Sequence, residues 1–171
     1  MIVSPGTTIA ELGLGLRRGA ITASGVVEQC LATIADRDPA LNAFITVLAD
    51  DARRQARAAD AELARGIDRG PLHGIPISLK DIIDLAGAPT TAASRLRAGH
   101  RAVTDAPVAA RLRTAGAVLI GKCNLHEFAF GTTGAESAHG PTRNPHEPAH
   151  IPGGSSSGSA VSVATGMAQA S

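Results

Sequence analysis

Apolar residues recur at helical spacing in the first part of the chain. Residues 9–16 follow Thr8, and Glu11 stands three positions after Thr8, which is the spacing of a capping box that opens a helix. A second helix is expected from about residue 22, because apolar residues then repeat every three or four positions. We expect the pair Asp38 and Pro39 to end this helix, since the residue before a proline disfavours the helical conformation.

A third helix is expected over residues 49–66, where charged residues are interleaved with alanines. This pattern is typical of an amphipathic surface helix whose charges are solvated. No motif that carries chemistry stands out before residue 70. We therefore interpret residues 1–69 as a helical entry section of the same domain as the rest of the chain.

The pattern changes after residue 70. Apolar and other residues alternate over residues 75–79, which predicts a strand with Lys80 and Asp81 at its end. Residues 105–116 begin with a capping aspartate and a proline in the first turn, and they predict a helix. The continuous apolar run of residues 117–121 predicts a buried strand. This order of elements indicates an α/β fold in which at least part of the sheet is parallel.

A glycine- and serine-rich stretch, residues 152–160, leads into a further predicted helix that begins near residue 157 with serines as its cap. Glycine allows positive φ and close approach of other groups, and a serine hydroxyl can donate, accept or attack when a base lies nearby. The same composition is typical of a flexible linker. From the stretch alone, both interpretations stay open.

Composition narrows the classes of function. The chain is 44% apolar, much of it alanine, and its 16 basic and 15 acidic residues leave a formal charge of +1. This balance gives no electrostatic footprint for nucleic acid, and no apolar run is long enough to span a bilayer, so we expect neither as a direct partner. The two cysteines form no CxxC pair, and the amino terminus shows no secretory signal. We expect a cytoplasmic protein.

Two lysines, Lys80 and Lys122, stand against fourteen arginines. Apolar neighbours should partly desolvate Lys80 and lower its pKa, so that its neutral amine could act as general base for a serine. The histidines show no metal-binding spacing, and neither a phosphate-binding loop nor a GxSxG elbow occurs. We expect no metal site. A Ser-His-Asp triad stays open, although no spacing supports it.

Four segments resemble, in order and spacing, the amidase signature family. They are residues 74–81 (GIPISLKD), 116–128 (GAVLIGKCNLHEF), 140–145 (GPTRNP) and 152–160 (PGGSSSGSA). The resemblance is strong over residues 70–171 and looser before them. It implies an α/β fold with a mixed sheet between helices, and hydrolysis of a carboxylic amide to an acid and ammonia or an amine. It implies no cofactor.

The resemblance also implies roles for single residues in a Ser–cis-Ser–Lys triad. Lys80 matches the catalytic lysine, and Ser155 matches the bridging serine that follows a cis peptide bond and relays a proton. Asp81 and Ser156 match supporting positions, as do the two glycines Gly153 and Gly154. Lys122 matches a strand-end lysine outside the triad, and we interpret it as structural.

The loop after the second strand matches a segment that lines the acyl pocket in the family. On this basis Phe130, Gly131 and Thr132 are candidate substrate-binding residues, with Phe128 beside them. The apolar Phe128 and Phe130 fit an uncharged part of a small amide substrate, and core packing would explain them as readily.

One departure from the family pattern is decisive. In the family the nucleophilic serine lies roughly two dozen residues after the bridging serine, in a second glycine-rich turn that forms the oxyanion hole. Only sixteen residues follow Ser155 in this sequence. We therefore expect residues 70–171 to be the first part of an amidase signature core that is incomplete at its carboxy terminus.

Two alternatives remain. One is the glutaminase component of a tRNA-dependent amidotransferase, which would work with partner subunits. His126 leans toward the general amidases, because the glutaminase components more often carry aspartate there. The other is a non-catalytic truncated fragment. A truncated sheet would expose an unpaired edge, so the chain is expected to associate, for example as a homo-oligomer.

Overall fold

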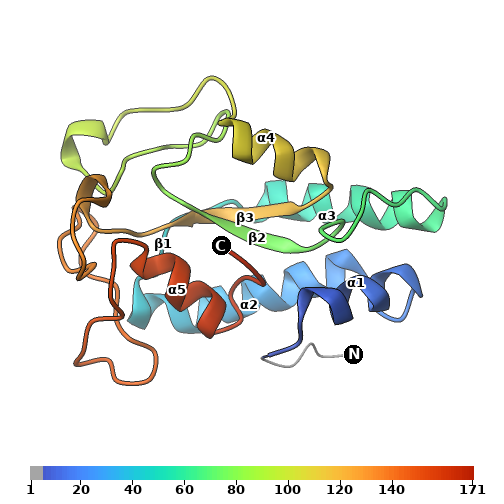
Figure 1. The fold of residues 1–171 in the computed structure, drawn as a ribbon, viewed down its shortest axis with the longest axis horizontal. Coiled ribbons are helices and arrows are strands. Elements are labelled where there is room, and N and C mark those ends of the chain that lie inside the picture. The colour runs from blue at the N-terminus through green and yellow to red at the C-terminus, as the bar shows by residue number, and fades with distance from the viewer. Residues whose placement is uncertain (1–5) are drawn as a thin grey trace.

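The computed structural model describes residues 6–171 and has the α/β architecture expected from the sequence (Figure 1). The first five residues, which belong to the amino-terminal stretch expected to carry no secretory signal, lie outside the described part. The α-helices of the described residues are α1 (Ile9–Arg17), α2 (Ala23–Leu41), α3 (Ala49–Ala64), α4 (Pro107–Thr114) and α5 (Ser157–Ala164). Two short 3₁₀ turns, η1 (Arg95–Arg97) and η2 (Glu127–Ala129), lie in the loops.

The start of α1 confirms the predicted capping box. The Thr8 hydroxyl accepts a hydrogen bond from the backbone N–H of Glu11, and the Glu11 carboxylate accepts one from the backbone N–H of Thr8. Each side chain thus satisfies a backbone group that the helix itself leaves free.

The predicted end of α2 at Asp38 and Pro39 is wrong, because the helix continues to Leu41. Asn42 then ends it in the left-handed conformation at φ 53°, and its N–H still donates to the Asp38 carbonyl oxygen. The Asp38 carboxylate accepts the next free N–H, that of Ala43, at 2.7 Å. Together with burial of Leu41, these contacts outweigh the hydrogen bond that Pro39 cannot make.

The sheet has three strands in the order β1–β3–β2. Strand β2 (Pro76–Lys80) pairs parallel with β3 (Val118–Cys123), as the strand–helix–strand order predicts. Strand β1 (Phe44–Val47) pairs antiparallel with β3 and makes the sheet mixed. Sequence analysis did not identify β1, because its four residues stand between two helices with only two residues before them and one after.

Strand β3 is the centre of the fold. It extends two residues beyond the predicted run and ends at Cys123, and all six of its residues are buried. At Gly121 the neighbouring strand passes so closely that an added Cβ would lie 2.7 Å from the carbonyl oxygen of Thr46. Glycine at this position therefore permits β1 to pack against the central strand.

Helices lie on both sides of the strands. In the view of Figure 1, α1, α2 and α5 lie below the strands and α4 lies above them. The side chains that fill the space between these layers are almost completely buried; examples are Val27, Ile75, Leu119, Ile120, Val161 and Met167. Because β2 and β3 are parallel, their carboxyl ends meet at one edge of the sheet, and residues that follow them lie together there.

The far edge of β2 is occupied by the last residues of the chain. Ser78 donates its N–H to the Ala170 carbonyl oxygen, and the N–H of Gln169 donates to Pro76, so this segment runs parallel to β2. No helix within residues 6–171 has the length and apolar character needed to cross a membrane.

Candidate active site

Lys80 ends strand β2 and reaches the glycine- and serine-rich turn before α5. Its Nζ donates to Ser155 Oγ at 2.6 Å and to Ser156 Oγ at 2.9 Å. The lysine is half-buried, and burial lowers its pKa from the ordinary value because the charged form loses water contacts. The structure therefore brings together residues that stand 75 positions apart in the sequence, and the turn makes defined contacts instead of serving as a linker.

The turn around Ser155 has a close-packed backbone. Gly153 has φ +85°, and the peptide bond between Gly154 and Ser155 is cis. An added Cβ at Gly154 would lie 2.6 Å from the backbone nitrogen of Gly134, so only glycine lets the loop after β3 approach. The Ser155 carbonyl oxygen accepts the N–H of His126 at 2.9 Å. His126 and Gly134, which follow β3, thus contact the backbone of the turn and fix its position.

The first turn of α5 packs closely against the end of β3. Gly158 donates its N–H to the Asn124 carbonyl oxygen at 3.0 Å, and an added Cβ there would lie 2.2 Å from the carbonyl oxygen of Ala43. Ser156 occupies the N-cap position, but its side chain makes no capping hydrogen bond. The prediction that these serines cap the helix is therefore wrong for Ser156, whose hydroxyl accepts from Lys80 instead.

Asn124 is a residue that sequence analysis did not select. Its buried side chain donates to the backbone carbonyls of Asn42 and Gly140 and accepts from the hydroxyl of Ser137. It thereby joins the end of α2 to the loop that runs from β3 toward the Ser155 turn. The signal in the sequence was an amide side chain directly after a buried strand, where its polar atoms need partners.

Asp81 points away from the serines, on the opposite side of the strand from Lys80. Its buried carboxylate lies 2.9 Å from Lys122 Nζ and accepts hydrogen bonds from the N–H and the hydroxyl of Thr91. Lys122 also donates to the carbonyl oxygen of Pro89 and the hydroxyl of Thr90. Asp81, predicted as a supporting residue, and Lys122, predicted as structural, thus form one ion pair. Sequence analysis did not predict this pairing.

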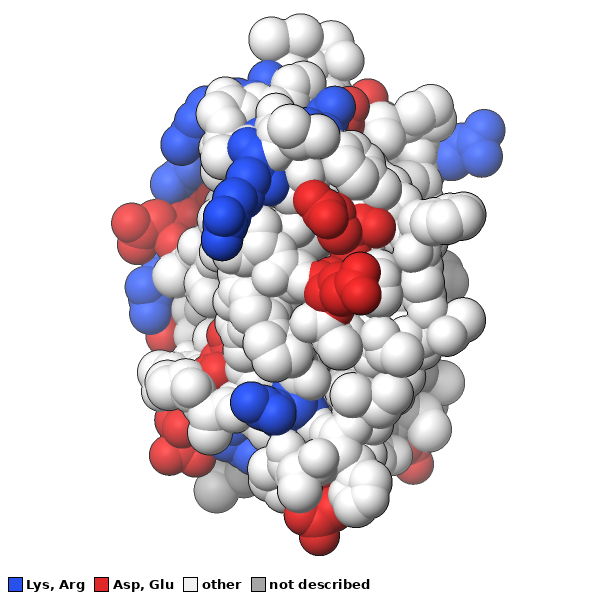
Figure 2. Space-filling model, turned by 90° about the vertical axis from the view of Figure 1, so that its left-hand side faces the viewer, with Lys and Arg blue, Asp and Glu red and all other residues white. Residues whose placement is uncertain are grey.

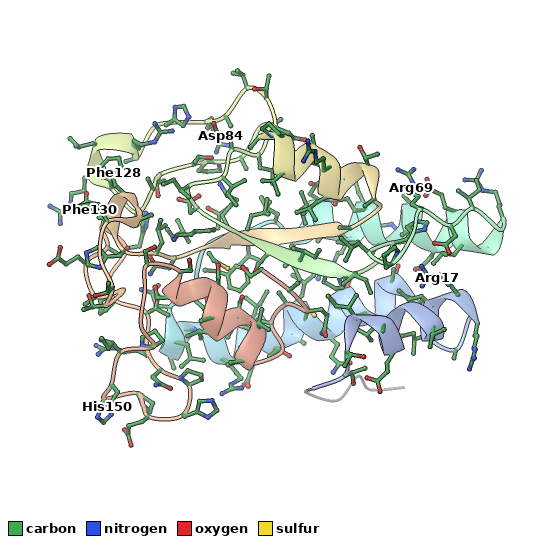
Figure 3. The ribbon with its side chains drawn as sticks, in the orientation of Figure 1. Arg17, Arg69, Asp84, Phe128, Phe130 and His150 are labelled. Carbon is green, nitrogen blue, oxygen red and sulfur yellow. The ribbon has the colours of Figure 1, made fainter. Side chains whose placement is uncertain are left out.

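The candidate substrate-binding residues follow β3 in the chain, and Figure 3 shows Phe130 among them with Phe128 beside it. Phe130 is 90% exposed and Phe128 is 45% exposed, and both lie at the end of the molecule where the loops gather. Gly131 packs beneath the ring of His126. Within the described residues, no hydrogen bond joins Phe130, Gly131 or Thr132 to Lys80 or Ser155. The loop meets the site through Gly134, which packs against Gly154.

Neither positive nor negative charge predominates on the surface at this end. Figure 2 shows acidic and basic side chains scattered over a largely uncharged face. Within residues 6–171, no three His, Cys, Asp or Glu side chains gather as a metal ion would need. The ionisable side chain that contacts the serines is Lys80, so the chemistry this arrangement offers is proton transfer between an amine and hydroxyl groups.

Comparisons with known proteins identify what this chain resembles. A family model described as "Amidase" matches residues 25–171. The chain is 48% identical over 163 residues to a component of the glutamyl-tRNA(Gln) amidotransferase of Anaeromyxobacter sp. (strain K). The match covers 95% of this chain and 33% of that protein, so the chain spans about a third of the curated relative's length.

Solved structures give the same picture. The native peptide amidase of Stenotrophomonas maltophilia superimposes with a TM-score of 0.90 at 42% identity, over 95% of this chain and 35% of that one. The corresponding glutamyl-tRNA(Gln) amidotransferase component of Thermotoga maritima superimposes with a TM-score of 0.76 at 35% identity, over 96% of this chain and 33% of that one. The resemblance that the sequence motifs predicted is confirmed.

Proposed function

Because this chain belongs to the amidase signature family, we propose that it forms the amino-terminal part of an enzyme that hydrolyses carboxylic amides, with Lys80 as general base and Ser155 as proton relay. The contact of 2.6 Å between Lys80 Nζ and Ser155 Oγ supports this proposal most directly. The lowered pKa of Lys80 supports it too, because a general base must be partly deprotonated near the working pH.

In the proposed reaction, the neutral amine of Lys80 takes the proton of the Ser155 hydroxyl as Ser155 takes the proton of the nucleophilic serine. The nucleophile's oxygen attacks the amide carbonyl carbon, and the tetrahedral intermediate collapses as the proton returns through Ser155 to the leaving nitrogen. Ammonia or an amine departs, and an acyl ester remains on the nucleophile. Water then repeats the proton path and releases the acid.

We infer that the nucleophile of this reaction is not among residues 1–171, and the contacts at the far edge of β2 support a position for it. Ala170 pairs in parallel with Ile77 of β2. A strand that continues from there would run beside the remaining residues of β2 and end level with Lys80, because parallel strands end at the same edge. We place the nucleophile and its oxyanion hole in the turn after such a strand, opposite Ser155.

A second function is favoured by the curated relatives. Those that share 46–48% identity with this chain are described as components of glutamyl-tRNA(Gln) amidotransferase. In this alternative the same site releases ammonia from glutamine, and partner subunits pass it to a charged tRNA. The substrate of the proposed amidase would instead be a simple carboxylic amide. We expect a cytoplasmic enzyme without a cofactor under either alternative.

One experiment separates these proposals. The polypeptide encoded by the uninterrupted gene is assayed for ammonia release from simple carboxamides and from glutamine, with and without partner subunits. We expect carboxamide hydrolysis, and we expect Lys80→Ala to reduce its rate by about 10²- to 10⁴-fold through loss of the base. Release from glutamine alone would favour the amidotransferase.

The control is the 171-residue chain itself. We expect it to release no ammonia from either substrate, because we place the nucleophile beyond residue 171. If it hydrolyses amides and loses that activity on Lys80→Ala, the placement of the nucleophile beyond residue 171 is wrong. If the gene ends at codon 171, the chain is a non-catalytic fragment.

A further inference from the structure

We propose that the imidazole of His126 is a positioning residue, which holds the loop of residues 127–136 against the Gly154–Ser155 turn and so sets the geometry of the contact between Ser155 and Lys80. This inference rests on the proposed function, because it concerns the proposed relay. It assigns a task to a side chain that sequence analysis used only to weigh one subfamily against another.

The ring of His126 lies inside the loop. The residue is 7% exposed, and its Nδ1 lies 3.3 Å from the hydroxyl of Thr133. Its Nε2 lies 3.4 Å from a carboxylate oxygen of Glu136. Beneath the ring, an added Cβ at Gly131 would lie 2.3 Å from the ring atoms. Thr133, Glu136 and Gly131 of the loop thus all contact the same imidazole ring.

The ends of the loop are tied together independently of the ring. The backbone N–H of Glu127 donates to the carbonyl oxygen of Glu136 at 2.8 Å, which closes residues 127–136 into a loop whose ends meet. The N–H of His126 itself donates to the carbonyl oxygen of Ser155. A change in the His126 side chain leaves both backbone bonds possible, so the contribution of the ring can be tested by itself.

Gly134, in the same loop, packs against the residues on both sides of Ser155. Gly134 packs so tightly that an added Cβ there would lie 2.4 Å from Ser157 Cβ. An added Cβ at Gly154 would lie 2.6 Å from the nitrogen of Gly134. A shift of Gly134 therefore moves the backbone on either side of Ser155, whose hydroxyl accepts from Lys80.

One contact of the ring joins it to a carboxylate. His126 carries a charge only when it is protonated, and Glu136, with its side chain 81% exposed, is the carboxylate within ion-pair distance of the ring. Glu127, the adjacent residue, is exposed, and Lys80 lies beyond the Ser155 turn. The contact between His126 Nε2 and Glu136 is therefore one that a substitution of an exposed residue can remove.

The chain offers two sets of internal probes for a test. Its three phenylalanines are Phe128 and Phe130 in the loop and Phe44 in the core, so fluorine-labelled phenylalanine gives loop signals and a core reference in one NMR spectrum. Its two lysines are Lys80 at the turn and Lys122 in the buried ion pair with Asp81, so acetylation by N-hydroxysuccinimide acetate can be compared between them by peptide mass spectrometry.

The variants are His126→Leu, which removes both ring nitrogens, and His126→Gln, which retains a donor for Glu136. We expect His126→Leu to shift the fluorine signals of Phe128 and Phe130. We also expect it to raise the Lys80 acetylation rate by about two- to fivefold, because a partly exposed polar pair contributes little energy and its loss has a small effect. The Phe44 signal and the Lys122 rate should not change. His126→Gln should restore most of the wild-type values.

Glu136→Gln keeps the test decisive if His126→Leu does not fold, because the Glu136 side chain is exposed. We expect it to shift the fluorine signals of Phe128 and Phe130 and to raise the Lys80 acetylation rate in the same direction as His126→Leu but by less, because the contact of His126 Nε2 loses its carboxylate partner. Unchanged Lys80 reactivity in His126→Leu, equal changes at both lysines, or loop fluorine signals that Glu136→Gln leaves unchanged would each overturn the proposal. None of these measurements needs catalysis. They can therefore contradict the role of His126 while the proposed function stands, and the proposed function can be contradicted while the role of His126 stands.

Discussion

Two lysines lie near the carboxyl ends of neighbouring parallel strands, and their surroundings differ. In the register of the sheet, Leu79 pairs with Lys122 and Lys80 pairs with Cys123, so the two side chains start from the same edge. Lys122 is completely buried beside the carboxylate of Asp81, whereas Lys80 is half-buried beside two hydroxyl groups. The comparison teaches that the partner, and not the strand end, decides what a lysine can do.

The partners differ in charge, and this has a direct consequence for protonation. A fully buried ammonium group needs a counter-charge, since removal from water is otherwise strongly unfavourable. Asp81 supplies that counter-charge to Lys122. The hydroxyls of Ser155 and Ser156 are neutral, so partial burial of Lys80 is not offset by an opposite charge, and its pKa falls.

The largest effect that tests this comparison is on stability. We expect Lys122→Met to lower the free energy of unfolding by about 3–5 kcal/mol, because it leaves the buried carboxylate of Asp81 without its counter-charge. The matched change Lys80→Met should alter it by no more than about 1 kcal/mol, since it removes a half-buried charge with neutral partners. Urea unfolding followed by circular dichroism measures both.

A double variant sharpens this prediction. Lys122→Met combined with Asp81→Asn removes both charges, and it should be more stable than Lys122→Met alone if the unpaired carboxylate causes the loss. Equal losses in Lys80→Met and Lys122→Met would contradict the distinction between the two sites. Size-exclusion chromatography of each variant checks that association does not change with the substitution.

Chemical reactivity should separate the lysines next. We expect N-hydroxysuccinimide acetate to modify Lys80 at least about tenfold faster than Lys122, because Lys122 becomes accessible only when the structure opens locally. Peptide mass spectrometry distinguishes the two products from acetylation of the amino terminus. In urea concentrations that unfold the chain, the ratio should approach one. A ratio near one in the native chain would mean that Lys122 is not protected as its burial implies.

Part of this arrangement could be predicted from the sequence. The strands that carry Lys80 and Lys122 follow from their apolar runs, and the motif that contains Ser155 indicated which turn to examine. The pairing of Asp81 with Lys122 could not be predicted, because it depends on the register of two strands separated by a long loop and α4. The hydrophobic pattern gives each strand's faces but not its neighbour's offset.

The features that sequence analysis missed depend on contacts that the hydrophobic pattern does not record. Strand β1 is too short for an alternating pattern to stand out, and its pairing with β3 determines it. Helix α2 passes Pro39 because contacts made by Asp38 and Leu41 outweigh a local preference. The task proposed for His126 depends on Thr133 and Glu136, which a loop brings to its ring. The pairing of β1 depends on a strand distant in sequence, whereas the contacts at α2 and at His126 are made by polar groups a few residues apart, which a hydrophobic pattern does not record.

The smallest expected effect is the pH dependence that Lys80 gives to stability. The pKa of Lys80 in the folded chain lies below its ordinary value of 10.5 because of burial. Between the folded pKa and 10.5 the unfolded chain therefore binds more protons, so this group's contribution to stability is fully present above 10.5 and is lost as the pH falls through the folded pKa. Lys80→Met should remove that rise.

A buried thiol opposes this trend and makes the difference between variants the quantity to measure. Burial raises the pKa of Cys30 from 9.0 to about 11, so its contribution is present below 9.0 and is lost as the pH rises toward 11. Subtracting the unfolding free energy of Lys80→Met from that of the wild type at each pH cancels the Cys30 contribution, because both chains contain that thiol. The remaining difference should rise with pH and level off near 10.5. A flat difference would mean that Lys80 is as well solvated in the folded chain as in the unfolded one, and the two strand-end lysines would then differ in burial without differing in protonation.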